Sequence, residues 1–367
     1  MMARLEEICA INMGQSPDSS TYNEDGNGLP FFQGNADYGE IYPAVRMWCS
    51  EPTKIAREKD ILISVRAPIG ALNIAKCECC IGRGLAALTV NEDICAQKYL
   101  WHALSGKVDE LNSKGTGSTF KAINKKTLSE TEIPLPPIDE QRKIAAILDK
   151  VSDLIAKRRQ QLDKLDEMVK ARFVEMFGDP QNNEKNWKMR TFKEICTVRQ
   201  GLQIPISKRL THFEENCYEY ITVAYLHGAK DKEYIKNPKS TVICTKDDVL
   251  MTRTGNTGMV ITNVAGVFHN NFFLIDFDRD KYIKEFLVEY LNLDLIQTEL
   301  KKRAGTSTIP DLNHSEFYKI AIYEPPMDLQ NQFSAFVNQT EKSKTTISRS
   351  LEKLETLKKA LMQEYFG

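Results

Sequence analysis

The architecture of this chain follows from a repeated segment, Leu162-Asp163-Lys164-Leu165 through Ala171-Arg172-Phe173-Val174-Glu175-Met176-Phe177-Gly178. It returns 189 residues later as Leu351-Glu352-Lys353-Leu354 through Ala360-Leu361-Met362-Gln363-Glu364-Tyr365-Phe366-Gly367, and eight of the seventeen aligned positions are identical. The same offset superposes the Pro-Pro pair at 136–137 on the pair at 325–326, and an offset of 187 pairs Gly14 with Gly201. The chain is therefore a tandem duplication whose halves should fold alike.

Each repeat ends in a long predicted helix, which begins after the Pro-Pro pair, where Asp139 or Asp328 can cap the first turn. Apolar residues then recur at alternating steps of four and three, the spacing of a coiled-coil seam. An isolated helix of this kind would more often serve a core or a homodimeric zipper, but two matched helices in one chain favour an internal antiparallel pair. The seam contains Ile144, Leu148, Val151, Leu162 and Leu165 in the first helix and Phe333, Val337, Ile347, Leu351 and Leu354 in the second.

The segment before each helix mixes short β-type runs with helical stretches. Runs such as 60–65 and its counterpart 248–253 predict strands, and 97–112 and 282–302 predict helices. We therefore expect an α+β fold, a pseudo-twofold tandem repeat of two mixed α/β domains separated by two long helices that form an antiparallel coiled coil. The predicted segments are 1–134, 135–178, 179–324 and 325–367.

Composition narrows the class of protein. The 367 residues are 42% hydrophobic and 27% charged, which suits two ordinary domains. Forty-nine lysines and arginines almost balance fifty acids, which argues against a wholly basic nucleic-acid coat but allows a local basic surface. No apolar run is long enough for a membrane span or a signal peptide, and nine scattered cysteines suggest reduced thiols. We expect a soluble, cytoplasmic protein.

Catalytic and metal-binding motifs are missing from the sequence. Gly106-Lys107 lacks the Ser or Thr of a Walker A motif, and the Pro-Pro pairs lack the flanking residues of a methyltransferase motif. Cys77, Cys79 and Cys80 have no second pair at zinc-site spacing, so free thiols are the better interpretation. The five histidines are scattered, with no nucleophile beside them. We therefore expect no catalytic residue and no metal site.

Two kinds of loop, each present in both repeats, suit DNA binding. The stretch 113–128 carries four lysines and no acid around a small hydroxyl-rich run, and 301–308 matches it. Small hydroxyl groups and main-chain amides beside cations can hold phosphates. The acid-free stretches 61–77 and 249–275 carry arginine and asparagine, which can read guanine and adenine edges. The candidate DNA-binding residues are Gln15, Ser16, Arg66, Arg83, Lys114, Thr116, Ser118, Lys121, Gln203, Arg253, Thr254, Asn256, Asn270, Arg303, Thr306 and Ser307.

The whole chain resembles the specificity subunits of type I restriction-modification enzymes. The resemblance is carried by Ile61-Leu62-Ile63-Ser64-Val65-Arg66-Ala67-Pro68-Ile69-Gly70, Ile81-Gly82-Arg83-Gly84-Leu85-Ala86-Ala87, Gly117-Ser118-Thr119-Phe120-Lys121-Ala122-Ile123 and Ile133-Pro134-Leu135-Pro136-Pro137 leading into Asp139-Glu140-Gln141. It implies two target-recognition domains, each reading half of a bipartite double-stranded DNA site, and two helices that dock two methylation subunits. It also implies that restriction subunits join the complex, and that S-adenosylmethionine, ATP and magnesium serve the partner subunits, with no cofactor in this chain.

Two other classes of protein remain open. A stand-alone sequence-specific DNA-binding regulator would bind its site tightly without partners. A self-contained enzyme would need catalytic clusters, which the sequence lacks. In the second repeat, Thr252-Arg253-Thr254-Gly255-Asn256 stands where the first has Ser64-Val65-Arg66-Ala67-Pro68, as expected if the two halves read different bases.

Overall fold

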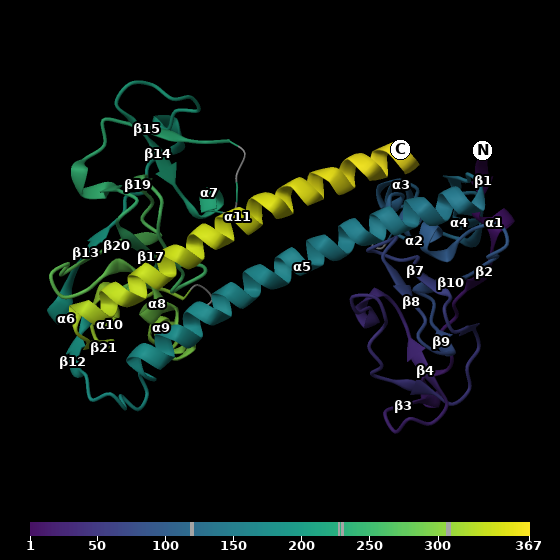
Figure 1. The fold of residues 1–367 in the computed structure, drawn as a ribbon, viewed down its shortest axis with the longest axis horizontal. Helices are drawn as coiled ribbons and strands as arrows, with labels where there is room; N and C mark the ends of the chain where they lie inside the picture. The colour runs from purple at the N-terminus through teal and green to yellow at the C-terminus, as the bar shows by residue number, and fades with distance from the viewer. Residues whose placement is uncertain (118–120, 227, 229–230, 306–309) are drawn as a thin grey trace. The chain divides into compact units, whose positions relative to one another are not determined.

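The computed structural model describes residues 1–117, 121–226, 228, 231–305 and 310–367, which form two compact units (Figure 1). Unit 1 contains residues 1–159 and 349–367, and unit 2 contains residues 160–348. The expected fold class is confirmed, because each unit combines a mixed α/β segment with parts of two long helices. The division into four consecutive segments stays a prediction. The compact units divide the chain in another way, because each contains about half of each long helix.

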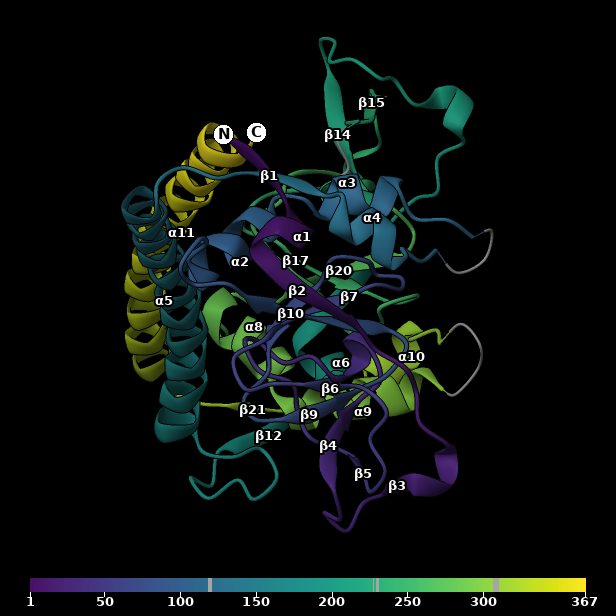
Figure 2. The ribbon, with the colours of Figure 1, turned by 90° about the vertical axis from the view of Figure 1, so that its right-hand side faces the viewer.

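The same four-stranded antiparallel sheet lies at the centre of both units. Buried aliphatic runs such as Ile61, Leu62 and Ile63 form its inner strands, since side chains covered on both faces must be apolar. Figure 2 shows β2, β10 and β7 of unit 1 side by side. The order in unit 1 is β2 (Cys9–Met13), β10 (Leu85–Val90), β7 (Ile61–Ser64) and β8 (Leu72–Ile74). Unit 2 repeats it with β13 (Cys196–Gln200), β20 (Phe272–Phe277), β17 (Val249–Thr252) and β18 (Val260–Ile261).

Each unit also carries a second, smaller sheet beside the central one. In unit 1 its order is β3 (Tyr22–Asn23), β5 (Trp48–Cys49), β4 (Leu29–Phe32), β9 (Cys79–Ile81) and β6 (Ile55–Ala56). In unit 2 the order is β15 (Tyr234–Lys236), β14 (Cys217–Ile221), β19 (Gly266–Phe268) and β16 (Ile243–Cys244). Two-stranded ribbons close the units: β1 (Met2–Arg4) with β11 (Glu132–Pro134), and β12 (Lys188–Thr191) with β21 (Ala321–Glu324).

Helices cover the sheets and supply most of the remaining core. The helices of unit 1 that matter here are α2 (Gln97–Ser105), α3 (Val108–Ser113) and α4 (Lys125–Ser129). Their counterparts in unit 2 include α8 (Lys284–Asn292), α9 (Asp294–Ala304) and α10 (His314–Phe317). The core of unit 2 is rich in aromatic rings, with Phe177 4.8 Å from Phe286 and Phe173 5.3 Å from Phe333 between ring centroids.

The two long helices are α5 (Ile138–Phe177) and α11 (Met327–Phe366), and their halves run antiparallel inside each unit. In unit 2, Phe173 packs on Phe333. Seven residues earlier in α5, Asp166 pairs at 2.5 Å with Lys344, which comes later than Phe333 in α11. In unit 1, Arg159 pairs with Glu355 at 2.7 Å. The predicted seam faces inward: Ile144, Leu148, Val151 and Phe333 are buried, and Leu162, Leu165, Val337, Ile347, Leu351 and Leu354 are half-buried.

A buried glutamine fixes the start of each long helix. Gln141 accepts a hydrogen bond from the Ala96 main-chain N–H at 2.9 Å, immediately before α2. Gln330 accepts the equivalent bond from Ile283 N–H at 2.9 Å, immediately before α8. Both side chains are fully buried, and both also donate to two main-chain carbonyls. The duplication thus extends to individual hydrogen bonds, which aligns α2 with α8 at an offset of 187.

Two further observations concern the chain as a whole. None of the helices in the described ranges combines the length and apolarity needed to cross a bilayer. All nine cysteines are unpaired, and only Cys77 is exposed.

Candidate nucleic-acid interface

In unit 1, the loop after β7 brings three predicted DNA-binding residues together. Arg66 forms an isolated β-bridge with Ala122, and Ala122 exchanges main-chain hydrogen bonds of 3.0 and 2.9 Å with Thr116. The Ala67 N–H donates to the Lys121 carbonyl at 3.0 Å. These bonds tie the lysine-rich loop to the end of a buried strand, so Arg66, Thr116 and Lys121 share one surface although the sequence separates them.

A close backbone crossing brings Gln15, Ser16 and Arg83 to the same place. Gly14 passes so near Gly82 that a Cβ on it would lie 2.2 Å from the Gly82 carbonyl oxygen, so only glycine fits. Beyond the crossing, Gln15 N–H donates to Ile81 O at 3.0 Å, and Arg83 N–H donates to Ser16 Oγ at 3.3 Å. A 2.9 Å bond from Val65 N–H to Gly84 O joins this group to the loop of Arg66.

A cavity of about 530 Å³ opens between these segments. Arg66, Arg83 and Ser64 line it together with Gln33, Asn35 and Asp37, which sequence reasoning did not identify. Asp37 is already engaged, because its carboxylate accepts bonds from the Gln33 and Gly34 main-chain N–H groups at 2.7 and 3.3 Å. Two arginines and two carboxamides therefore face a hollow that a base edge or phosphate can enter.

The cations of this surface differ in how available they are. Arg66 and Arg83 are exposed, and neither side chain forms an ion pair or a hydrogen bond with another residue in the part of the chain that the structure describes. Lys114, in contrast, lies 2.6 Å from Glu110, and that hydrogen bond holds the pKa of Glu110 below its usual range. Arg66 and Arg83 can therefore bind an anion or a base edge without giving up a partner.

Unit 2 has the same backbone but different side chains. A Cβ on Gly201 would lie 2.2 Å from His269 O, and Leu202 N–H donates to Phe268 O at 3.0 Å. Leu202 thus takes the place of Gln15, Gln203 that of Ser16, and Asn270 that of Arg83. The bridge between Thr254 and Asp311 matches the one between Arg66 and Ala122. Thr254 is consequently the counterpart of Arg66.

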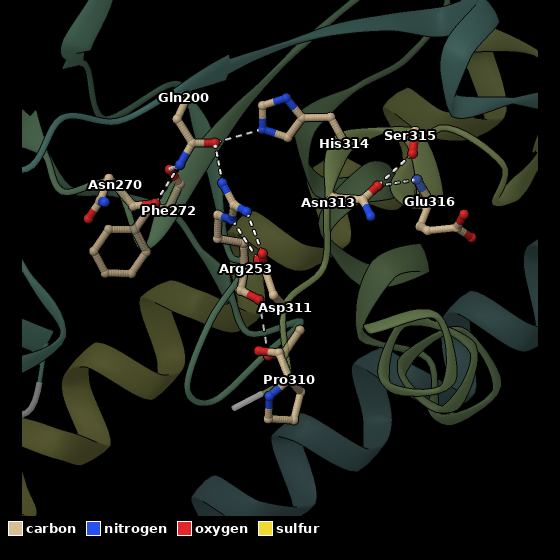
Figure 3. Close-up of polar contacts among 11 residues, drawn as sticks. Gln200, Arg253, Asn270, Phe272, Pro310, Asp311, Asn313, His314, Ser315 and Glu316 are labelled. Carbon is tan, nitrogen blue, oxygen red and sulfur yellow. Dashed lines mark hydrogen bonds and ion pairs between the residues drawn. The ribbon is translucent and has the colours of Figure 1, made fainter. Parts of the chain in front are cut away.

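Arg253 occupies the position of buried Val65 and is held in a polar network (Figure 3). Its Nε and one terminal nitrogen lie 2.7 and 2.6 Å from the two oxygens of Asp311. Its other terminal nitrogen donates to Gln200 Oε1 at 3.2 Å, and His314 Nε2 is 2.8 Å from the same oxygen. The bond from Arg253 lowers the pKa of Asp311, while burial, followed by the charge of Arg253, lowers the pKa of His314.

The other predicted residues of unit 2 are placed as follows. Asn256 is exposed, with Nδ2 3.7 Å from Met259 Sδ. Asn270 is half-buried, and its Oδ1 is shielded from solvent with no hydrogen-bond donor among the described residues. Arg303 is engaged by Glu299 at 2.6 Å and by Glu316 at 3.3 Å. Ser118, Thr306 and Ser307 lie outside the described residues.

Sequence reasoning also missed Gln200, Asp311 and His314. A signal was available for Gln200, because the 187-residue offset places apolar Met13 at its position in the first repeat. A polar residue that replaces an apolar one at the end of a strand, where it is half-buried, needs a polar partner. Nothing in the sequence marked Asp311, which is 58 positions away from Arg253. Across the described ranges, no group of three or more histidine, cysteine or acidic residues could hold a metal ion.

Comparisons with known proteins converge on one family. The family model described as the type I restriction modification DNA specificity domain matches residues 1–166 and 184–358. A Methanocaldococcus jannaschii protein named as the MjaX specificity subunit of a type I restriction enzyme is 43% identical over 165 residues, 45% of this chain and 39% of that protein. The MjaIX specificity subunit of the same organism is 25% identical over 378 residues, 91% of this chain and 85% of that protein.

A solved structure shows the same fold. The type I restriction-modification S subunit from M. genitalium superposes with a TM-score of 0.65 at 15% identity, covering 100% of this chain and 96% of that one. At this level of identity the similarity extends to the fold alone. The match to MjaX spans less than half of that relative, whereas the match to MjaIX spans most of it.

Proposed function

Because the chain belongs to the type I restriction modification DNA specificity family, we propose that it reads a bipartite double-stranded DNA target, one half-site per unit. The observation that carries the proposal is the repeated backbone around Gly14 and Gly201. The same hydrogen bonds hold both loops in place, yet the side chains presented there differ: Arg66 and Arg83 in unit 1, Thr254 and Asn270 in unit 2. A shared backbone that presents different side chains in each unit suits two half-sites of different sequence.

In this proposal the chain recognises DNA and partner subunits perform the chemistry. Two methylation subunits dock on the long helices, and restriction subunits join through the assembled complex. S-adenosylmethionine, ATP and magnesium serve those partners, and the complex acts in the cytoplasm. The duplicated Gln141 and Gln330 anchors support two docking positions, because they orient each long helix identically against α2 and α8.

Exchange of one predicted target-recognition domain tests whether each unit recognises one half-site. Residues 1–134 are replaced by the corresponding segment of another family member, the chimaera is produced with the partner subunits, and methylated adenines are mapped. We expect one half-site to change while the other half-site and the spacer stay the same. A change in both half-sites would contradict separate readers.

Native mass spectrometry tests the docking of partners. At saturation we expect one copy of this chain with two methylation subunits, and a limit of one methylation subunit per chain would contradict the proposal. The same preparation addresses the alternative of a stand-alone regulator. A regulator would bind its site with full affinity when no methylation subunit is present, whereas a specificity subunit should gain affinity when the partners enclose the duplex.

A further inference from the structure

Unit 2 contains a cavity of about 900 Å³ bordered by α8 and by the unit 2 halves of α5 and α11. Thr262 and Asn263 of the acid-free stretch 249–275 also line it, and most of its lining side chains are charged or polar. The charged side chains that line it are Asp166, Lys170, Lys284, Glu285, Glu289, Glu341, Lys342 and Lys344. The four acids and four lysines give the lining no net charge. What distinguishes this cavity is which of these side chains has a hydrogen-bond or ion-pair partner.

Glu289 is the one acidic side chain of this lining that has no partner among the described residues. Its Oε1 is shielded from solvent and accepts no hydrogen bond from the described residues. Burial raises the pKa of this carboxyl group, even though Lys170 and Lys344 lie near enough to oppose that effect. A buried acceptor that lacks a donor carries an uncompensated desolvation cost, and an external N–H group placed beside it would remove that cost.

The other three carboxylates of the lining are already engaged. Lys344 lies 2.5 Å from Asp166 and 2.7 Å from Glu341, so two carboxylates share its ammonium group. Glu285 accepts a 3.0 Å hydrogen bond from Ser334. The lining therefore supplies each of its other carboxylates with a donor and leaves Glu289 open to a group that enters from outside.

The equivalent buried polar group in unit 1 already has a partner. The Gln141 and Gln330 anchors align α2 with α8 at an offset of 187, which places His102 where unit 2 has Glu289. His102 is buried, and its Nε2 lies 2.8 Å from Asp149 Oδ1. In unit 2 the counterpart of Asp149 is Asn338, which donates to Ser334 instead. Unit 1 thus satisfies its buried polar group within the chain, and unit 2 does not.

We infer that the unit 2 cavity is a docking site for an arginine side chain of the methylation subunit, which donates its guanidinium N–H groups to Glu289. The inference rests on the proposed function. A guanidinium group offers five donors in a planar fork and is more weakly hydrated than an ammonium group, which suits a half-buried carboxylate. Because unit 1 lacks this acceptor, the two docking positions differ chemically, and the two methylation subunits bind with unequal affinity.

The test uses the full chain titrated with its methylation subunit, with the two binding steps resolved by native mass spectrometry. Glu289→Gln keeps the shape of the side chain and removes its charge. We expect it to weaken one of the two steps about tenfold or more and to leave the other unchanged. A second variant, Glu289→His with Asn338→Asp, introduces the pair found in unit 1 and should weaken the same step. Glu184→Gln, an exposed residue of the same unit, is the matched control.

The outcomes separate this inference from the proposed function. If the unmodified chain binds two methylation subunits and Glu289→Gln changes neither step, the docking site is wrong and the proposed function stands. Equal weakening of both steps would also overturn the site, because it is confined to unit 2. If the unmodified chain binds no methylation subunit, the proposed function fails, and the inference fails with it. Thermal unfolding of each variant checks that unit 2 remains folded.

Discussion

Arg253 and Asp311 face one another across two loops of unit 2 and form a two-point ion pair, with N···O distances of 2.7 and 2.6 Å. Planar pairing of this kind fixes the orientation of the guanidinium group as well as its position. Arg253 therefore presents its remaining nitrogen to Gln200 rather than to solvent. For a residue predicted to read bases, this means that contact with DNA competes with Asp311.

Replacement of Asp311 by asparagine should release Arg253. We expect tighter binding to random duplex DNA, because a cation is freed, and weaker discrimination at one half-site. The stability loss should be about 1 kcal/mol or less, since the pair is partly exposed to solvent. Fluorescence anisotropy on specific and random duplexes measures both effects. Asp280→Asn, an exposed residue of the same unit, makes the same charge change without touching the network.

Removal of a base reader and removal of a phosphate contact should have different signatures. Arg66→Ala should cost about 1 to 3 kcal/mol mainly on the true site, and Arg83→Ala should behave alike because both side chains line one cavity. Lys121→Ala should weaken binding to all sequences and reduce the salt slope. Lys114→Ala should do the same to a smaller extent, because Glu110 already holds its ammonium group. Equal losses for Arg66→Ala on specific and random DNA would exclude it as a base reader.

The long helices should set the spacing between half-sites. Four residues inserted after Arg158 lengthen α5 by roughly 6 Å and add about 40° of net rotation. One base pair adds about 3.4 Å and roughly 35° of twist, so we expect the spacer to grow by one or at most two base pairs. Some affinity should be lost, because the insertion disturbs the seam. Mapping of methylated adenines measures the spacer. An unchanged spacer would mean that the long helices do not set the distance between the half-sites.

The stability of unit 1 should fall as the pH drops below neutrality. Burial lowers the pKa of His102 below 6.5 despite its bond to Asp149, and Lys98 and Lys358 oppose protonation further. The unfolded chain then binds a proton more readily than the folded one, so stability is present above pH 6.5 and is lost as the pH falls below that value. Asp149 adds no opposing change there, because its own pKa is lowered.

Hydrogen exchange of the α2 amides, corrected for intrinsic rates, measures this effect at pH 7.5 and pH 5.5. We expect protection to decrease at the lower pH and His102→Gln to flatten the dependence. A direct NMR titration should give a pKa below 6.5 for the imidazole of His102. A pKa above 6.5 would contradict this prediction, because it would mean that the hydrogen bond and charge of Asp149 outweigh burial.

Periodicity allowed the long helices and their seam to be predicted, because an amphipathic helix is determined by the spacing of its own residues. Ile144, Leu148, Val151 and Phe333 are buried as the seam requires. The sequence also paired Gly14 with Gly201 as equivalent positions of the two repeats, and the structure shows that each lies at a backbone crossing beside its predicted DNA surface. The spacing of nearby residues was enough for the seam, whereas the need for glycine at these two positions follows from the distant carbonyl groups of Gly82 and His269.

Partners could not be predicted in the same way. Arg253 and Arg66 both appear in acid-free stretches, yet only Arg253 meets a carboxylate, because an isolated bridge brings Asp311 next to Thr254. The cavity residues Gln33 and Asn35 carry no periodic signal, since they belong to a connection with a single short 3-10 helix, whose course depends on the strands that it joins. The offset of 187 also pairs His102 with Glu289. Whether each side chain has a hydrogen-bond partner, however, depends on the residues of other helices that pack beside it.

The sequence by itself determined the duplication, the two long helices and the kind of side chain available at each loop, because these depend on spacing and residue type along the chain. The tertiary structure alone decided which of those side chains are free. Arg66 and Arg83 remain open toward a cavity, Arg253 and Arg303 are paired, and Glu289 is left without a donor. Hydrogen bonds and ion pairs act over a few ångströms, so the availability of a group is a property of the packed chain rather than of its sequence neighbours.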